Sequence, residues 1–182
     1  MVIFKFRLSE LEYFDYNYFT AWSRPEKKGF RTRYYLRIFL SYCLIAGLFI
    51  FINHSEQVVV DIVVFSIIAL IYFLSVPALI RHSVRRRVKE ILEKPENKHV
   101  LEESEIMISD TGIVEKDEAS ETRYEWSAIV RKAETTDCYL LYTNSFHAVV
   151  IPKRVVSNPR EKQQFQELLN RHLPLSSEFP AR

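Results

Sequence analysis

The sequence predicts a membrane α-helical hairpin followed by a small α+β domain. Two apolar runs, Leu36–Ile52 and Val58–Ile80, are separated by only five residues. Helices of 17 and 23 residues extend roughly 26 and 35 Å, which is close to the hydrocarbon core of a bilayer at about 30 Å. After residue 97 the pattern changes to short strands and one final helix, the order typical of an α+β domain.

The hairpin is assigned to residues 34–80. Neither run carries a polar stripe, which disfavours the alternative of two buried helices in a soluble protein. Asp61 lies near the outer end of the second run, where a charge costs little, and Pro77 lies near its inner end, where a kink is tolerated. A signal peptide is disfavoured because the first run begins late and the second follows at once.

Basic residues flank the two runs, whereas the loop between them has no Lys or Arg. The positive-inside rule therefore predicts that both termini lie in the cytoplasm. Basic side chains near anionic headgroups contribute about 1 kcal/mol each, so the lipid bilayer is an expected partner. The predicted membrane-interface residues are Arg24, Lys27, Lys28, Arg31, Arg33, Arg37, Arg81, Arg85, Arg86, Arg87 and Lys89.

Residues 1–33 are predicted to form a short strand and an aromatic interfacial helix. From Phe4 to Leu8, apolar residues alternate with basic ones, which is the period of a half-buried strand. Ser9 and Glu12 have the spacing of a capping box for the helix that follows. The aromatic side chains of this helix suit either the membrane interface or packing on the later domain, and both alternatives stay open. The strand is expected to join the sheet of the later domain and cover its edge.

The region after the hairpin divides into three predicted parts. Residues 81–97 form a basic juxtamembrane helix and a linker with a break at Pro95. Residues 98–173 form the cytoplasmic domain, an antiparallel β-meander or roll with a C-terminal helix capped by Asn158 or Ser157; its order fits a pleckstrin-homology-like roll. Residues 174–182 form a flexible tail. The six strands are expected at residues 103–108, 113–116, 122–125, 130–134, 138–142 and 146–151.

Charge and composition exclude several classes of protein. The chain has a net charge of +2, but residues 100–182 contain 10 basic and 14 acidic residues, a net charge of −4. An acidic domain argues against nucleic acid as a partner, and membrane topology accounts for the basic run Arg85–Arg87. Cys43 and Cys138 are expected to be unpaired apolar fillers. The five histidines lack the spacing of metal ligands.

The sequence contains no recognised catalytic motif. Glycine occurs only three times, so a glycine-rich phosphate loop is missing. The sequence therefore predicts a protein that is not an enzyme and uses no cofactor or metal. The acidic residues of the first strands and turns are expected on solvated faces, where nothing raises a carboxyl pKa for acid–base work. They are Glu102, Glu103, Glu105, Glu115, Asp117, Glu118 and Glu121.

Three short motifs in order resemble the YcxB-like membrane proteins of bacteria. They are Ile108-Ser109-Asp110-Thr111-Gly112-Ile113, Tyr124-Glu125-Trp126-Ser127-Ala128-Ile129 and Ile151-Pro152-Lys153-Arg154. The resemblance also covers the layout of strand, helix, two spans and strand-rich domain. It implies a bacterial inner-membrane location and a cytoplasmic domain similar to the pleckstrin-homology-like folds. It implies no activity, and it assigns no catalytic residues.

Three residues within these motifs are candidates for partner contact or core packing. Trp126 is expected to anchor the core, with a ligand contact as the alternative. Lys153 and Arg154 follow the last strand and are expected to be solvated, with pairing to acidic strands or to headgroups as alternatives.

The leading functional hypothesis is a non-enzymatic binding or scaffolding module held at the inner leaflet of the bacterial membrane. Its acidic domain favours a protein partner over direct lipid binding. The alternative is a structural or oligomer-forming subunit that acts through its hairpin, in which small residues permit close helix contact. The oligomeric state stays open. The small residues of the hairpin are Ser41, Ala46, Gly47, Ser66, Ala69 and Ser75.

Overall fold

The structure is a computed structural model that describes residues 1–53, 57–118 and 120–173. The predicted flexible tail, residues 174–182, lies outside the described residues. The chain forms two compact units. One unit is Ala21–Arg86, and the other combines Met1–Thr20 with the chain from Arg87 onward. The second unit, called the soluble unit below, thus draws on residues both before and after the apolar runs.

The first unit contains the long apolar helix α2 (Lys28–Asn53) and most of a second one, α3 (Val58–Leu92), whose residues from Arg87 onward belong to the second unit. Both are long and apolar enough to cross a membrane, and their most apolar windows are 6% and 0% buried within the protein. Such exposure differs from the core helices of a soluble protein. As predicted, α3 continues without interruption beyond its apolar run and ends shortly before Pro95.

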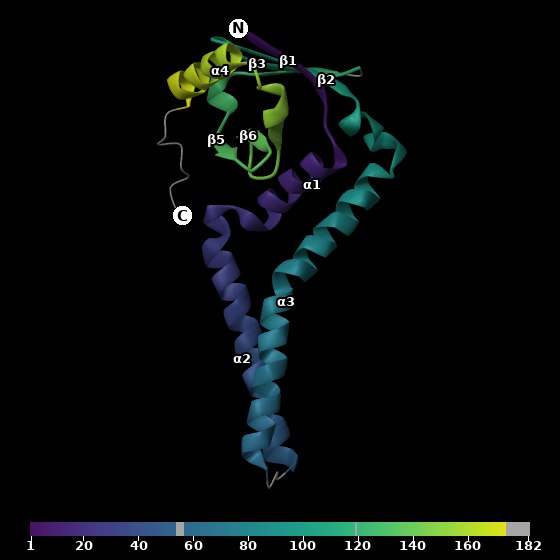
Figure 1. Ribbon diagram of the computed structural model, residues 1–182, viewed down its shortest axis with the longest axis vertical. Coiled ribbons are helices and arrows are strands. Elements are labelled where there is room, and N and C mark those ends of the chain that lie inside the picture. The colour runs from purple at the N-terminus through teal and green to yellow at the C-terminus, as the bar shows by residue number, and fades with distance from the viewer. Residues whose placement is uncertain (54–56, 119, 174–182) are drawn as a thin grey trace. The chain divides into compact units, whose positions relative to one another are not determined.

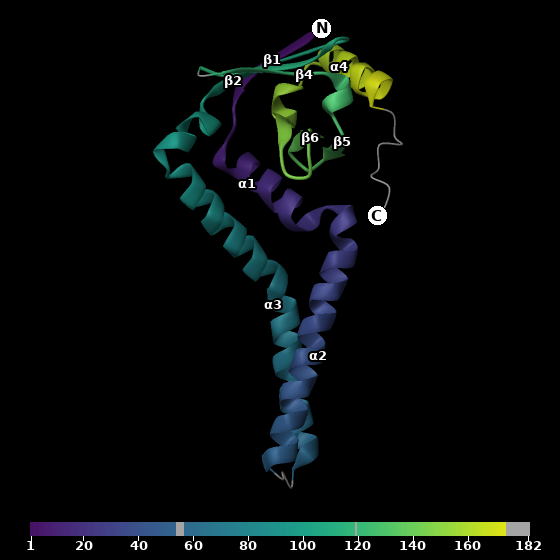
Figure 2. The same ribbon diagram turned by 180° about the vertical axis from the view of Figure 1, so that it is seen from behind.

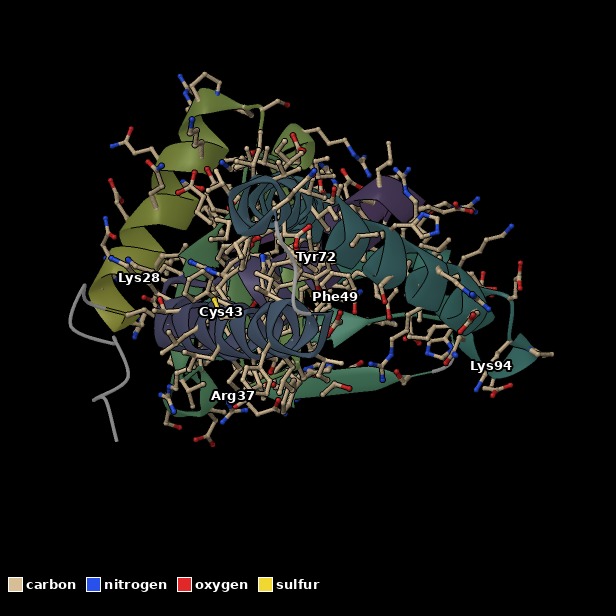
Figure 3. All side chains as sticks on the ribbon, turned by 90° about the horizontal axis from the view of Figure 1, so that it is seen from below. Lys28, Arg37, Cys43, Phe49, Tyr72 and Lys94 are labelled. Atoms are coloured by element: carbon tan, nitrogen blue, oxygen red, sulfur yellow. The ribbon has the colours of Figure 1, made fainter. Side chains whose placement is uncertain are left out.

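Aromatic side chains hold α2 and α3 together within the hairpin. Figure 3 labels Phe49 of α2 and Tyr72 of α3. The Tyr42 hydroxyl donates a hydrogen bond of 2.6 Å to the Phe65 carbonyl. The rings of Phe49 and Phe65 have centroids 5.4 Å apart, and those of Tyr35 and Phe73 are 5.8 Å apart. These contacts lie at successive levels, so they form one aromatic seam along the hairpin.

The soluble unit contains a four-stranded antiparallel sheet with the order β1-β2-β3-β4. Its strands are β1 (Val2–Arg7), β2 (Glu103–Ser109), β3 (Gly112–Lys116) and β4 (Glu121–Tyr124). The pairing of β1 with β2 confirms that the N-terminal strand joins the sheet of the later domain. Alternate residues of β1 face the core, as its period predicts.

A second, three-stranded antiparallel sheet follows with the order β5-β6-β7. Its strands are β5 (Arg131–Glu134), β6 (Cys138–Tyr142) and β7 (Ala148–Pro152). All six predicted strands are present and pair in chain order, except that β4 and β5 belong to different sheets. The predicted meander is therefore divided in two at the 3₁₀ turn Trp126–Ala128.

Helix α4 (Pro159–His172) packs against the core between the sheets (Figure 1). Its N-cap is Asn158, whose Oδ1 accepts a hydrogen bond of 3.0 Å from the Arg160 amide, as one of the two predicted caps. Phe165 is fully buried and meets the rings of Phe4 and Tyr139 at centroid distances of 5.7 and 5.2 Å. Two antiparallel sheets with a C-terminal helix confirm the α+β class.

Helix α1 (Glu10–Tyr18), extended by the π-helical turn Phe19–Ser23, lies beside β6 (Figures 1 and 2). The predicted capping box of Ser9 and Glu12 is present. Tyr16 and Phe19 pack on a buried cluster that belongs to the second sheet. Of the two alternatives for this helix, the structure shows packing on the domain. The cluster consists of Cys138, Leu140, Tyr142, Ala148 and Val150.

Candidate functional site

A polar cavity of about 330 Å³ opens in the soluble unit. It lies among the first sheet, α1, the 3₁₀ turn Pro95–Leu101 and the start of β7. Small-molecule sites commonly have volumes of about 300–1,000 Å³, so this cavity is large enough for a small ligand. Its polar and aromatic lining residues are Tyr13, Tyr16, His99, Ser104, Glu115, Asp117, Ser120, Thr122, Tyr124 and His147.

The register of the first sheet aims Glu115 toward the interior. Glu115 lies opposite Ile106 on β2 and opposite Thr122 on β4. Residues directly opposite one another in an antiparallel pair project from the same face of the sheet. Ile106 is buried in the main core together with its own partner, Phe4. Four residues therefore lie side by side across the sheet on its inner face. Those on β1 and β2 belong to the core, whereas those on β3 and β4 are Glu115 and Thr122.

The surroundings of the Glu115 carboxyl group disfavour its ionised form. Burial raises its pKa above the ordinary value, and the nearby charge of Asp117 raises it further. The hydroxyl of Tyr124 has a raised pKa for the same reasons, first burial and then the charge of Glu115. In the described part of the chain, the Glu115 carboxylate has no hydrogen bond or ion pair. The cavity therefore contains an acidic group that the protein itself does not neutralise.

The opposite wall is held in place by hydrogen bonds. The Tyr16 hydroxyl donates to the Phe146 carbonyl at 2.5 Å, which ties α1 to the loop before β7. The His147 amide donates to Asn144 Oδ1 at 2.8 Å, and the His147 ring lies 6.4 Å from that of Tyr124. Rings from α1, β4 and this loop consequently surround the cavity.

The lining excludes two kinds of chemistry. Among the described residues that form its wall, none is Lys or Arg, so an anion would find no permanently charged basic partner there. Over residues 1–53, 57–118 and 120–173, no group of three or more His, Cys, Asp and Glu is arranged to hold a metal ion. The arrangement can offer carboxylate charge, hydroxyl groups and aromatic faces to a ligand.

The expectation that the acidic residues occupy solvated strand faces is wrong for Glu115. The side chain is half-buried and lies on the inner face of the sheet. A signal was present in the sequence, because Glu115 and the core residue Ile113 are two positions apart on one strand. The assignment failed because an acidic residue near a strand end was taken as solvent-facing.

The structure places Trp126 in the main core. Its side chain is 9% exposed, and its Nε1 donates a hydrogen bond of 3.0 Å to the Ser109 carbonyl. The indole stacks on the imidazole of His172, with centroids 4.8 Å apart and planes inclined by 6°. Trp126 thus joins the turn between the two sheets to the end of α4.

Arg154 and Lys153 pair with acidic groups. Arg154 holds the Glu12 carboxylate with two hydrogen bonds, from Nε at 2.7 Å and from Nη2 at 3.0 Å, and Nη2 also donates to the Arg7 carbonyl. Burial raises the pKa of Glu12, but hydrogen bonds from Arg154 and Ser9 outweigh it, so the pKa is below its ordinary value. Lys153 Nζ lies 2.7 Å from the Glu134 carboxylate. These pairs fasten α1 and the β7 end, and they lie outside the polar cavity.

The basic residues around the hairpin differ in exposure. Arg24 is only 7% exposed, and Arg31 donates hydrogen bonds to the Trp22 and Arg24 carbonyls at 2.6 and 3.3 Å. Lys27 lies 5.4 Å from the centroid of the Phe30 ring. The remaining ones are exposed, namely Lys28, Arg33, Arg37, Arg81, Arg85, Arg86, Arg87 and Lys89.

Cys138 is a buried filler of the second sheet. Burial beneath α1 raises the pKa of its thiol to about 12, with the charge of Glu12 as the next cause. A thiol with this pKa is protonated at neutral pH and is a poor nucleophile.

The fold defines a class, an α+β domain joined to two apolar helices that are long enough to span a membrane. Residues 108–169 match the family described as YcxB-like protein, which confirms the resemblance for 62 of the 182 residues. No curated protein and no solved structure matches the chain. The matched segment includes Glu115, Thr122, Tyr124 and His147 of the cavity.

Proposed function

We propose that this protein is a non-enzymatic, membrane-anchored binding module whose ligand or partner engages the polar cavity of the soluble unit. The observation that carries the proposal is the inward-facing carboxylate of Glu115. An uncompensated charge on the inner face of a sheet costs stability, and such costs are found where a site serves a ligand.

The proposed location is the bacterial inner membrane, with α2 and α3 as spans and both termini in the cytoplasm. Two exposed apolar helices and the basic residues beside them support this location. We further propose that the soluble unit is pleckstrin-homology-like. Sheets of four and three antiparallel strands with a C-terminal helix support this finer description.

Anchoring supplies the mechanism. A module held at the inner leaflet meets other membrane-associated molecules at high effective concentration, so a weak affinity is sufficient. The net charge of −4 over residues 100–182 favours a protein partner over anionic lipid, and it disfavours nucleic acid. The bilayer is then the anchor, and the protein partner is the specific ligand.

The test is capture of bound molecules by the full-length chain in mild detergent, compared with two variants. Ser104→Trp fills the cavity from β2 and should abolish capture. Ser127→Trp, at an exposed site in the turn between the sheets, is the matched control and should leave capture intact. Equal capture by all three chains would contradict the proposal.

The alternative is a structural or oligomer-forming subunit that acts through its hairpin. It is favoured by the low burial of both apolar helices, which leaves helix surface available to other spans. Replacing α2 and the apolar part of α3 with an unrelated two-span hairpin separates the two proposals. Capture survives the replacement if the cavity binds the partner, and it is lost if the hairpin does.

A further inference from the structure

We infer that the polar cavity binds an alkylammonium group, that is, the protonated amine of a free small molecule or of a lysine side chain on the partner protein. This inference rests on the proposed binding function and names the chemistry that the cavity recognises. It follows from the charge, the aromatic surface and the size of the cavity.

The charge of the cavity wall favours a cation. Glu115 and Asp117 place two carboxylates in the wall, and no Lys or Arg among the described residues shares that wall. The residue opposite Glu115 on β4 is the neutral Thr122, so the neighbouring strand places no cation beside this carboxylate. A bound cation would supply the missing charge, and Coulomb attraction is stronger in a partly desolvated cavity than in water.

The aromatic surface of the cavity also favours a cation. Tyr13 and Tyr16 line the cavity from α1, and Tyr124 lines it from β4. A cation within about 6 Å of an aromatic face gains roughly 0.5–2 kcal/mol, more when it is desolvated. Tyr16 is fixed by its hydrogen bond to the Phe146 carbonyl, and Tyr124 by its position opposite Ile113. The aromatic wall is therefore organised before a ligand arrives.

The lining and the volume of the cavity suit an organic cation better than a metal ion. Metal sites need several ligand atoms that converge on one point at about 2.0–2.6 Å. His99, His147, Glu115 and Asp117 all line the cavity, yet within the described chain they form no such cluster. A volume of about 330 Å³ is also far larger than a single metal ion requires. Alkylammonium, with a charged head and an apolar stem, matches this mixed wall.

The experiment is calorimetric titration of the full-length chain in phosphatidylglycerol nanodiscs with n-butylammonium, which has the form of a lysine side chain. The expected result is saturable binding that Glu115→Gln weakens at least tenfold. Glu103→Gln is the matched control, because it removes the same charge from the opposite face of the same sheet. Sodium and magnesium are titrated in parallel and should not saturate the site.

A second variant supplies the cation from the protein. Thr122→Lys places an ammonium group opposite Glu115 in the sheet register. This variant should no longer bind n-butylammonium, and its midpoint of thermal unfolding should be equal to or higher than that of the unchanged chain. A lower unfolding midpoint, whether or not n-butylammonium still binds, would show that a cation does not stabilise the Glu115 carboxylate.

Two further arms distinguish the sources of the ammonium group. If a lysine of the partner protein occupies the cavity, acetylation of the partner's lysines abolishes its capture and n-butylammonium competes with it. If a free amine is the ligand, mass spectrometry of the purified chain detects an amine that Glu115→Gln loses, and acetylation has no effect.

The outcomes separate this inference from the proposed function. If capture depends on the cavity but n-butylammonium does not bind, the ammonium inference is wrong and the binding function stands. If Ser104→Trp leaves capture unchanged, the binding function fails whatever the titration shows. Saturable magnesium binding that requires Glu115 would replace the organic cation with a metal.

Discussion

The two sheets of the soluble unit differ in how many of their faces are covered. In the second sheet, one face contributes Leu141 and Ile151 to the main core, and the other carries the cluster beneath α1. In the first sheet, only the inner face is covered. Its outer face carries the ion pair of Lys5 with Glu105 at 2.7 Å and the exposed Ile3.

The sequences of the strands reflect this difference in coverage. Strands buried on both faces have nearly continuous apolar runs, and β6 and β7 do. Strands covered on one face alternate, as β1 does. The first sheet departs from alternation where Ser104, Glu115 and Thr122 occupy inner positions, and the cavity opens there. A polar residue at an inner position of a half-covered sheet therefore indicates a site.

Phe165→Ala should cause the largest effect, because it removes the ring that meets both sheets. Phe165 contacts Phe4 of the first sheet and Tyr139 of the second. Truncation of a buried Phe costs about 3–5 kcal/mol, so the unfolding free energy should fall by that amount. Urea unfolding of the full chain in nanodiscs, followed by Trp126 fluorescence in a Trp22→Phe background, measures the change.

The control for this prediction is Phe146→Ala. The Phe146 side chain is 72% exposed, and surface truncations change stability by about 0.5 kcal/mol or less. Comparable losses for both variants would show that α4 does not join the sheets through Phe165.

Gly112→Ala should destabilise the first sheet by about 2–3 kcal/mol. Gly112 has φ of +147°, and a Cβ there would collide with the carbonyl of Tyr124. Gly47→Ala is the matched control, because a Cβ at Gly47 meets nothing within 4 Å and alanine favours a helix. Hydrogen exchange should show faster opening of β2–β4 than of β5–β7, and equal acceleration in both sheets would contradict the assignment.

Arg154→Gln should loosen the cover of the second sheet and cost about 1–2 kcal/mol at pH 7. The loss is limited because half of the Arg154 side chain is exposed to solvent. The pKa of Glu12 is lowered in the folded state, so its ionised form stabilises the fold above pH 4.5. This contribution disappears as the pH falls through the folded-state pKa. Urea unfolding of both chains at pH 7 and pH 3 should therefore give a difference that shrinks in acid.

Arg123→Gln provides the comparison for this pair. Arg123 and Glu121 form an exposed pair at 2.8 Å on the uncovered face of the first sheet. Solvent screens exposed pairs, so little change is expected at either pH. An equal loss for the two variants would mean that the Glu12 pair does not hold α1.

Glu115→Gln should have the smallest effect on stability, with the opposite sign. The pKa of Glu115 is raised in the folded state, so the stability of the unchanged chain is fully present below pH 4.5 and falls as the pH rises through the folded-state pKa. The amide removes this loss. The variant should be slightly more stable at pH 8 and equal at pH 3 in thermal unfolding. A less stable variant at pH 8 would show that the carboxylate is structural.

Local signals made much of the fold predictable. The apolar runs, the capping box at Ser9, the cap at Asn158 and the six strands each depend on residues close together in the chain, and the structure has all of them. The packing of α1 was not decided by such signals. It rests on contacts such as Thr20 Oγ1 with the Tyr142 hydroxyl at 2.6 Å, between residues 122 positions apart.

The candidate site was less predictable than the fold. Trp126, Lys153 and Arg154 are candidates because they lie within short motifs, and in the structure they join elements of the soluble unit. The inner position of Glu115 depends on its pairing with Ile106, which requires the register of two strands. Tyr13 and Tyr16 line the cavity, but they precede the two apolar runs in the sequence, whereas β3 follows these runs. No local sequence pattern connects the two tyrosines with β3.

The pairing of β1 with β2 determines the order in which parts of the protein can fold during synthesis. β1 ends at Arg7, and its partner begins at Glu103, after both apolar helices. At roughly 5–20 residues per second, synthesis separates the two strands by on the order of 5–20 s. During that interval the apolar side of β1 has no sheet to join. The hairpin therefore leaves the ribosome before the domain can close, and a nascent chain halted within α3 cannot form its first strand pair.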